Sequence, residues 1–430
     1  MKQRDVGLLH ELSVLAGQDY EFLRYSNDRS VKDAFLAGDI EEPNLLYHDI
    51  DPVFIEEQRD VLTAMIDVVT RFDDEIVRRA YLPKLREYED KYMLLDRARV
   101  GDDEGVLACS TRLYGAPQEQ YFRYALRGLA ARLGAVYDTL GTEPLVQDAY
   151  DTLIEHVPEQ TAEYPWDHIV LPTPRPYAVA DALSAEEIRA AFVEAFMRFG
   201  VTNWSALVDA PGERMTFSTN HSLRTIFIPS DEDLLNRKYA MTRERVEALI
   251  AHEVGTHVVR RERGEQSELG LLGIGLAGYL RGEEGVATYN EQVLDGTRHF
   301  AGGFQYVAVG WASGIDGRAR TFRQLYELLQ PYMFISSLEH ALAYEEPYAL
   351  QALYEKSKRR AWARCVRIFR GTSGSTPGAC FTKDVVYLEG NVAIWELVDE
   401  DATWPTRFSL GKYDPANEEH VALLRDMGMF

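Results

Sequence analysis

The chain has 430 residues, a formal net charge of −23 and three cysteines, Cys109, Cys365 and Cys380. Its length is sufficient for a large hydrophobic core or for several packed subdomains. The acidic charge disfavours binding to nucleic acid and to anionic membranes, and three scattered cysteines exclude a disulfide framework or a thiolate metal site. No run of about 18 apolar residues occurs, and Met1–Ser26 mixes charged with apolar side chains. We therefore expect a cytoplasmic protein without a membrane span.

The first third of the chain is predicted to be helical, because its apolar residues recur at helical spacing with few β-rich runs between them. The segments with this pattern are Asp5–Leu36, Pro52–Asp96 and Pro117–Leu140. A proline-rich passage, Pro165–Pro176, interrupts the pattern and is the best candidate boundary. We predict a helical N-terminal subdomain, residues 1–170, and a second domain, residues 171–430.

The second domain begins with a helix that a capping box at Ser184 and Glu187 opens and that Gly200 closes. Three strand-like pieces follow, at Thr202–Val208, Arg214–Ser218 and Arg224–Ile228. They predict a small, mostly antiparallel sheet that leads into a helix beginning near Thr242. Later helices are expected at Glu283–Leu294, Arg318–Leu329 and Tyr348–Phe369, and a β-rich run at Phe381–Leu388. The fold class is therefore α+β and mostly helical.

The helix after the sheet contains two histidines five residues apart, His252 and His257, in the pattern H-E-x-x-x-H. On a regular α-helix residues five apart point about 140° away from each other, so the two imidazoles could not bind one ion. A π-type turn with one extra residue brings such positions together. We therefore predict a widened turn around Val254–Thr256, and we expect Gly255 to lower its steric barrier.

A catalytic zinc ion takes three protein ligands and leaves one position for water. His252 and His257 with a downstream glutamate fit this count for one Zn²⁺ ion, and Glu253 is placed to act as the general base. Of two adjacent glutamates, we favour Glu284 as the third ligand over Glu283. Glu283 is then expected to accept a hydrogen bond from a ligand histidine.

At these residues the chain resembles the microtubule-associated tyrosine carboxypeptidases and their bacterial relatives named for a Q-E-G-L-A motif. The matching stretches are His252–Arg260, Glu283–Ala287, Phe381–Gly390 and, more weakly, Thr111–Pro117. The resemblance implies a zinc metallopeptidase with ligands His252, His257 and Glu284 and with Glu253 as base. The chain departs from the family pattern at Glu283, where bacterial relatives often have Gln, and at Val286, where Leu is usual.

The substrate does not follow from the resemblance. The animal enzymes of the family remove a tyrosine from the acidic tail of tubulin, and a chain with a net charge of −23 and no evident basic stripe is poorly suited to such a tail. We expect a peptide or protein C-terminus as the substrate, without an assignment of its sequence.

Four residues are candidates for contacts with the substrate. A carboxypeptidase needs a cation for the terminal carboxylate, and Lys383 and Arg370 flank a glycine-rich loop in a suitable position. Tyr387 and Tyr289 are candidate donors to the oxyanion.

The sequence thus predicts a gluzincin-like zinc metallopeptidase, with carboxypeptidase activity as the leading hypothesis and endopeptidase activity left open. The alternatives are a zinc hydrolase of a small amide and a non-catalytic, metal-dependent regulator or scaffold. The oligomeric state is not predicted.

Overall fold

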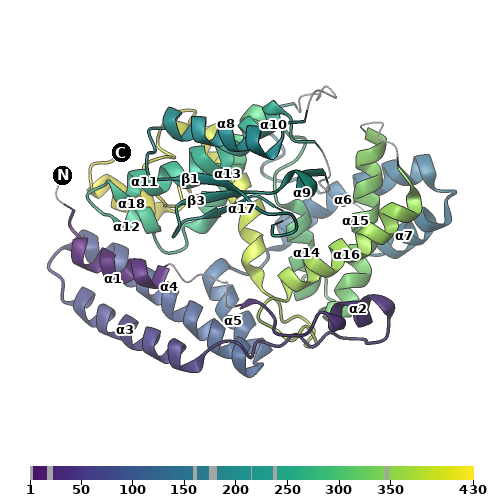
Figure 1. The fold of residues 1–430 in the computed structure, drawn as a ribbon, viewed down its shortest axis with the longest axis horizontal. Helices are drawn as coiled ribbons and strands as arrows, with labels where there is room; N and C mark the ends of the chain where they lie inside the picture. Colours follow the sequence, from purple (N-terminus) through teal and green to yellow (C-terminus); the bar gives the residue numbers. More distant parts are fainter. Residues whose placement is uncertain are drawn as a thin grey trace.

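The computed structural model describes residues 3–16, 23–157, 162–173, 182–214, 216–235, 240–343 and 348–430. Helices dominate these ranges and a single three-stranded sheet is found in them (Figure 1), which confirms the mostly helical α+β class. Pro174 and Pro176 of the predicted boundary, and Met215 of the second predicted strand, lie outside the described residues.

The N-terminal part is helical, as predicted, but two of the predicted segments, Asp5–Leu36 and Pro52–Asp96, are each divided into two helices, the second of them at Asp74. Its helices are α1 (Val6–Ala16), α2 (Ser30–Ala37), α3 (Pro52–Thr70), α4 (Glu75–Val100), α5 (Asp103–Tyr114), α6 (Glu119–Leu140) and α7 (Pro144–Ile154). Asp51, Asp74 and Asp102 each accept hydrogen bonds from backbone N–H groups at the start of α3, α4 and α5. Such caps satisfy N–H groups that have no partner within the helix, and they set where each helix begins.

A small unit follows, built from helix α8 (Ala185–Arg198), the sheet, and helices α9 (Asp231–Leu235) and α10 (Arg243–His252). The predicted capping box is confirmed, because the Ser184 and Glu187 side chains each bond the other's backbone N–H. Gly200 has a φ of +70° where the chain leaves the helix, a conformation that favours glycine.

The sheet is mixed, so the expectation of a mostly antiparallel sheet is wrong. Its strands β1 (Ser205–Val208), β2 (Ser218–Asn220) and β3 (Thr225–Ile228) are ordered β1-β3-β2, with β1 parallel and β2 antiparallel to β3. The central strand, β3, is the most apolar of the three, and its residues Ile226 and Ile228 are fully buried. β2 overlaps the predicted strand Arg214–Ser218 only at Ser218. It is an edge strand, because in the described sheet it pairs with β3 on one side and with no strand on the other.

The C-terminal part is again helical. It contains α11 (Val259–Glu265), α12 (Leu271–Ile274), α13 (Leu280–Asp295), α14 (Gly303–Ser313), α15 (Phe322–Ala343), α16 (Leu350–Ile368), α17 (Val385–Glu400) and α18 (Glu418–Asp426). The β-rich run predicted at Phe381–Leu388 is instead a 3₁₀ turn, Thr382–Asp384, followed by the first turn of α17. Its β-branched residues continue into a helical pattern whose buried face includes Val392 and Ile394, and this packing overrides their strand propensity.

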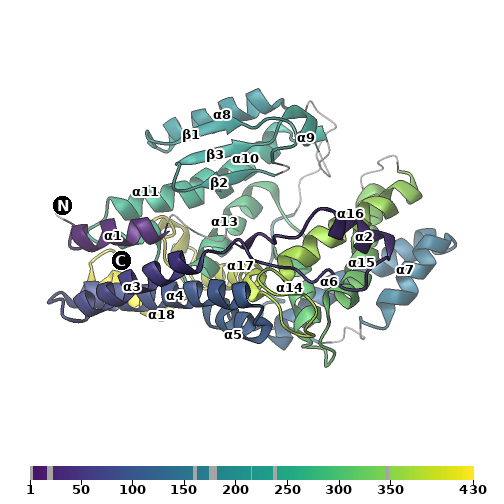
Figure 2. The same ribbon diagram turned by 60° about the horizontal axis from the view of Figure 1, so that its bottom comes forward.

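Two hydrophobic cores organise these elements. The larger core joins the N-terminal helices to the C-terminal ones, as where Phe35 of α2 packs against Phe322 of α15 and Trp362 of α16. The smaller core lies within residues 185–258, between α8, the sheet and α10. Figure 2 shows this small unit above the helical body. The proposed division at residue 170 stays a prediction.

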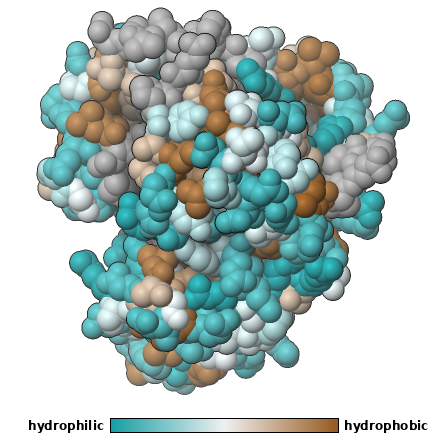
Figure 3. Space-filling view, turned by 90° about the vertical axis from the view of Figure 1, so that its right-hand side faces the viewer, coloured by the Kyte–Doolittle hydropathy of each residue, from teal (hydrophilic) through white to brown (hydrophobic). Residues whose placement is uncertain are grey.

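None of the helices in the described part of the chain combines the length and the apolar character that crossing a membrane requires. On the face drawn in Figure 3, hydrophobic residues form small groups among hydrophilic ones.

Helices α13 and α17 approach each other unusually closely at two glycines. A Cβ atom added to Gly285 would lie 2.4 Å from the carbonyl oxygen of Gly390, and one added to Gly390 would lie 2.1 Å from the carbonyl oxygen of Arg281. Real Cβ atoms essentially never come this near to backbone atoms, so the two helices must separate to admit a side chain.

We predict that Gly285→Ala lowers the free energy of unfolding by about 2 kcal/mol, within the usual cost of overpacking. Gly134→Ala in α6 is the matched control, because an added Cβ there meets no atom within 4 Å. Helix propensity should make that control neutral or stabilising by up to about 1 kcal/mol. Urea denaturation measures both, and equal stabilities of the two variants would contradict the close packing.

Candidate metal centre

The helix that carries both histidines widens between them. Residues Glu253–Val258 form a π-helix that joins α10 to α11, which confirms the predicted widened turn. The hydroxyl of Thr256 donates to the carbonyl oxygen of Ala251, five residues earlier, at 3.0 Å. An added Cβ at Gly255 would only make ordinary contact with Phe199 at 3.5 Å, so the folded turn has room for a side chain at this position. The expectation that Gly255 lowers the steric barrier to the turn stays a prediction.

The π-turn brings the two imidazoles together, and α13 adds a carboxylate. The rings of His252 and His257 have centroids 5.2 Å apart. One nitrogen of each ring and a carboxylate oxygen of Glu284 all lie within 4.8 Å of one another. The three side chains predicted as metal ligands therefore converge in space.

Each histidine of the triad is oriented by a carboxylate at Nδ1. Nδ1 of His257 lies 2.9 Å from Oε1 of Glu283, and Nδ1 of His252 lies 3.0 Å from Oε2 of Glu291. An ionised carboxylate only accepts hydrogen bonds, so Nδ1 carries a proton in both rings and Nε2 is the nitrogen left to bind an ion. This arrangement is typical of histidines that bind a metal through Nε2.

The carboxylates make the triad favourable for a cation. Burial opposes protonation of His252, but nearby carboxylates, that of Glu291 foremost, outweigh burial and raise the His252 pKa to about 9. The other carboxylates that contribute are those of Glu253 and Glu284. A bound cation would be stabilised by the same negative potential.

Glu283 is the centre of a buried cluster of charges. It accepts from Nη1 of Arg260 at 2.6 Å, and Nζ of Lys412 lies 3.0 Å from its other oxygen. Burial opposes its ionisation, but Lys412 and Arg260 outweigh that cost and hold the pKa of Glu283 well below its usual range. Arg260 also donates to backbone carbonyl groups of Gly411 and Tyr413. The cluster thus connects the segment around Lys412 to the helix of the metal centre.

The predicted base, Glu253, lies at the edge of the sheet. The Thr219 hydroxyl on β2 donates to Oε2 of Glu253 at 2.6 Å. Because β2 is an edge strand of the described sheet, the carboxylate lies beside a strand that could pair with an extended peptide.

The two tyrosines predicted as oxyanion donors lie in different places. Tyr387 lies on α17, which packs closely against α13, and the charge of Glu284, followed by burial, raises the pKa of its phenol. Tyr289 instead packs in the large core, with its ring 4.7 Å from that of Trp395 and 5.7 Å from that of Phe408. This position argues against the role predicted for Tyr289.

The two predicted cations are also separated. Lys383 is half-buried in the 3₁₀ turn that precedes α17. Arg370 is half-buried just after α16, where its charge acts on Tyr47 of the N-terminal part. A role of Arg370 at the triad is not favoured by this position.

Several residues of the site were not identified from the sequence. Glu291 follows Glu284 by seven residues, so its place on the same helix face could have been found from spacing alone. Thr219 and Lys412 come from distant segments and carry no such signal. His221, in the turn after β2, lies with its ring centroid 6.5 Å from that of His257 and with Nε2 3.3 Å from Nζ of Lys412.

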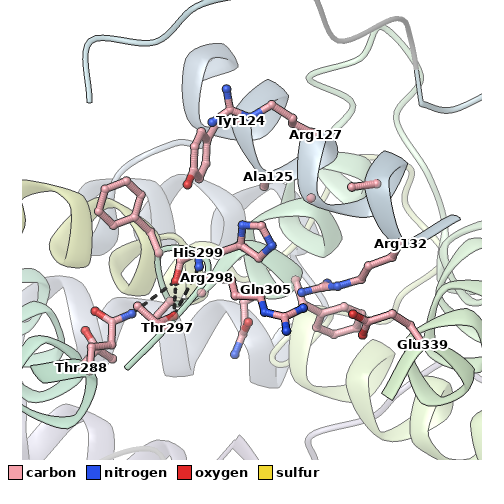
Figure 4. A pocket seen from close by; sticks show the side chains of 18 of the residues that line it. Tyr124, Ala125, Arg127, Arg132, Thr288, Thr297, Arg298, His299, Gln305 and Glu339 are labelled. Carbon is pink, nitrogen blue, oxygen red and sulfur yellow. Dashed lines mark hydrogen bonds between the residues drawn. The ribbon is translucent and has the colours of Figure 1, made fainter. Parts of the chain in front are cut away.

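A cavity of about 1030 Å³ runs along the part of α13 that carries Thr288 and Glu291. Glu291, which pairs with His252, lines it, and so does Thr288, one helical turn beyond Glu284. Figure 4 shows Arg127 and Arg132 on one helix of its wall, with Glu339 on another side. The cavity therefore offers space for part of a ligand next to the metal centre.

Comparison with known proteins supports a relationship to one family. Residues 335–430 match the family model described as "Microtubule-associated tyrosine carboxypeptidase". The human protein "Microtubule-associated tyrosine carboxypeptidase 1" is 27% identical to the chain over 183 residues, which cover 41% of this chain and 32% of the human protein. The match thus spans about a third of the relative's length. These findings confirm the resemblance inferred from the motifs.

The buried cluster around Glu283 leads to a prediction about stability. Glu283→Gln removes the negative charge that two buried cations share, and we expect it to lower the free energy of unfolding by about 3 kcal/mol. Lys412→Met removes one of those cations. We therefore expect Lys412→Met to lower the free energy of unfolding less in the Glu283→Gln variant than in the parent chain. A double-mutant cycle by urea denaturation measures this coupling. Additive losses would show that the charges of Glu283 and Lys412 do not interact.

Proposed function

We propose that the chain is a zinc-dependent metallopeptidase that removes a C-terminal residue from a peptide or protein. The observation that carries this proposal is the convergence of His252, His257 and Glu284 within 4.8 Å, with Glu253 adjacent to the first histidine in the sequence. The exopeptidase part rests on the similarity to proteins described as carboxypeptidases.

The donor set suits zinc. Two neutral imidazole nitrogens and one carboxylate oxygen are the ligands of many catalytic zinc sites, and such a set leaves one position for water or substrate. Nδ1 of each histidine is occupied by a carboxylate, so Nε2 is available to the ion. A zinc ion held there would lower the pKa of a water molecule and polarise the scissile carbonyl group.

The residues around the triad would then move the protons. Glu253 accepts a proton from the attacking water and delivers it to the leaving amine as the peptide bond breaks. Thr219 donates to Oε2 of Glu253, which orients the carboxylate and leaves Oε1 for the water. The Tyr387 hydroxyl, near Glu284, is the proposed donor to the oxyanion that develops on the carbonyl oxygen.

The edge of β2 is the proposed platform for the substrate backbone. An extended peptide that pairs with β2 would form main-chain hydrogen bonds and pass beside Glu253, which contacts that strand through Thr219. Main-chain pairing is independent of the substrate sequence, so selection among substrates requires side-chain subsites elsewhere.

We expect Glu253→Gln to keep zinc and to lose at least about 10³-fold in turnover, because the amide cannot accept the proton of the attacking water. Metal analysis and a peptide library read by mass spectrometry provide the two measurements. The parent chain should release single C-terminal residues, and Glu244→Gln, at an exposed position of α10, should behave like the parent. Internal cuts would indicate an endopeptidase, and an absence of cleavage by zinc-loaded protein would refute the peptidase.

Glu291→Gln should weaken zinc binding by about 10- to 100-fold, because a neutral amide orients the His252 imidazole less strongly than a carboxylate does. Competition with a chelator of known zinc affinity measures the change. Glu194→Gln, at an exposed position of α8, is the control. Equal affinities of the two variants would contradict the role of Glu291.

A further inference from the structure

One face of α13 meets the helix of the two histidines with four polar side chains. The face consists of Glu283, Glu284, Asn290 and Glu291. Residues seven apart on an α-helix point in nearly the same direction, so these two neighbouring pairs form one surface. Glu283 and Glu291 bond Nδ1 of the histidines, and an oxygen of Glu284 lies within 4.8 Å of a nitrogen of each ring. Asn290 instead contacts the turn between the two histidines.

The contact of Asn290 with this turn is a chain of two hydrogen bonds. Nδ2 of Asn290 donates to the hydroxyl of Thr256 at 2.9 Å, and that hydroxyl donates to the carbonyl oxygen of Ala251 at 3.0 Å. Thr256 is fully buried. A hydroxyl that accepts one hydrogen bond and donates another is polarised by the first, which strengthens the second. We refer to these two hydrogen bonds as the Thr256 bond pair, and it joins α13 to the backbone of the residue before His252.

The second bond of the pair distinguishes the π-turn from a regular helix. In an α-helix a threonine hydroxyl bonds the carbonyl group three or four residues earlier, which here would be that of Glu253 or His252. The carbonyl group that Thr256 bonds is five residues earlier, and it comes within reach because the turn contains one more residue. Straightening Glu253–Val258 into an α-helix would therefore break this bond.

Helix α13 is a firm support for Asn290. The side chain of Asn391 on α17 donates to the Thr288 hydroxyl at 2.8 Å and to the Gln292 amide oxygen at 2.9 Å, and all three residues are buried. Trp395 of α17 also donates to the Gln292 amide oxygen, at 2.7 Å. Movement of α13 would leave these buried groups without partners, which is costly. Asn290 is therefore held at a fixed position beside the π-turn.

The turn is thus supported by two kinds of contact. Val254 and Val258 pack in the small core, and the Thr256 bond pair connects the turn to α13. Apolar contact has no preferred direction, whereas a hydrogen bond weakens steeply when its distance or angle changes. The bond pair therefore specifies the number of residues in the turn more sharply than the apolar contacts do.

We propose that Thr256 and Asn290 are positioning residues that hold the π-turn in its widened form before a metal ion binds. This proposal rests on the metal-dependent function proposed above and assigns the residues that prepare its site. With the turn fixed, His252 and His257 are together in advance, and the ion does not have to reorganise the helix. If only a fraction of the molecules had the widened turn, the apparent affinity for the ion would fall in proportion to that fraction.

Three variants of the bond pair and one matched control test this role. Thr256→Val removes the hydroxyl and keeps the branched shape, Thr256→Ser keeps the hydroxyl, and Asn290→Leu removes the donor at similar size. Thr372→Val is the control, because Thr372 is also buried and its hydroxyl also donates to a backbone carbonyl group, that of Phe369, while it accepts from an N–H group, that of Gly374. Asn290 is only half-buried, so Asn290→Leu remains a test should Thr256→Val fail to fold.

Competition with a chelator of known affinity measures zinc binding by these variants. We expect Thr256→Val to weaken binding about tenfold, Asn290→Leu to weaken it by a smaller factor, and Thr256→Ser to change it by less than about twofold, because the net effect of one hydrogen bond is of this size. Thermal unfolding measures stability in parallel. Thr256→Val and Thr372→Val should both lower the melting temperature, and only Thr256→Val should change the affinity for zinc.

Hydrogen exchange of the metal-free protein provides a readout that needs neither metal nor catalysis. The backbone amides of residues 252–258 should exchange faster in Thr256→Val and Asn290→Leu than in the parent, and at the parent rate in Thr256→Ser and Thr372→Val. Unchanged exchange and unchanged zinc affinity in Thr256→Val would overturn the proposal, and so would an equal loss of affinity in Thr372→Val. If the parent binds no zinc, the metal-dependent function is refuted, and the exchange rates alone decide whether the bond pair holds the turn.

Discussion

One additional residue between two histidines imposes the constraint on which the metal centre depends. In a regular α-helix His252 and His257 would diverge, and no arrangement of the other elements could bring their nitrogens to one ion. The π-turn Glu253–Val258 removes this obstacle, with a hydrogen bond from Thr256 to the backbone of the preceding turn. Val254 and Val258 of the same turn are fully buried in the small core, so packing holds the unusual geometry in place.

Both acidic and basic side chains surround the candidate metal centre. Carboxylates around His252 create a negative potential that favours a cation. Beside His257, the cations Arg260 and Lys412 compensate the negative charge of Glu283. Both arrangements occur inside a chain whose net charge is −23. The net charge therefore does not describe the local field around the two histidines.

The chemical part of the site could be predicted because it lies in two short segments. The spacing of His252 and His257 requires a π-turn if both are to bind one ion, and that turn is present. Glu284 could be favoured over Glu283 by comparison with a motif, and its oxygen lies with the two histidine nitrogens. At Gly255 a Cβ atom would fit, so packing in the folded turn does not by itself demand glycine there. The packing of Tyr289 against Trp395 and Phe408 in the large core was not evident from the sequence.

The sequence by itself determined the helical character of the chain, the widened turn and the residue types that could hold an ion, because these follow from spacing within a single helix or from a local cap. Tertiary structure alone decided which distant residues complete the site. Thr219 reaches Glu253 from the sheet, Lys412 reaches Glu283 from near the C-terminus, and Arg367 of α16 reaches Tyr387 of α17. The mixed order of the strands was decided in the same way, by burial of the apolar strand β3 at the centre. Contacts of this kind depend on how helices and strands pack, and packing is a property of the whole chain rather than of any segment.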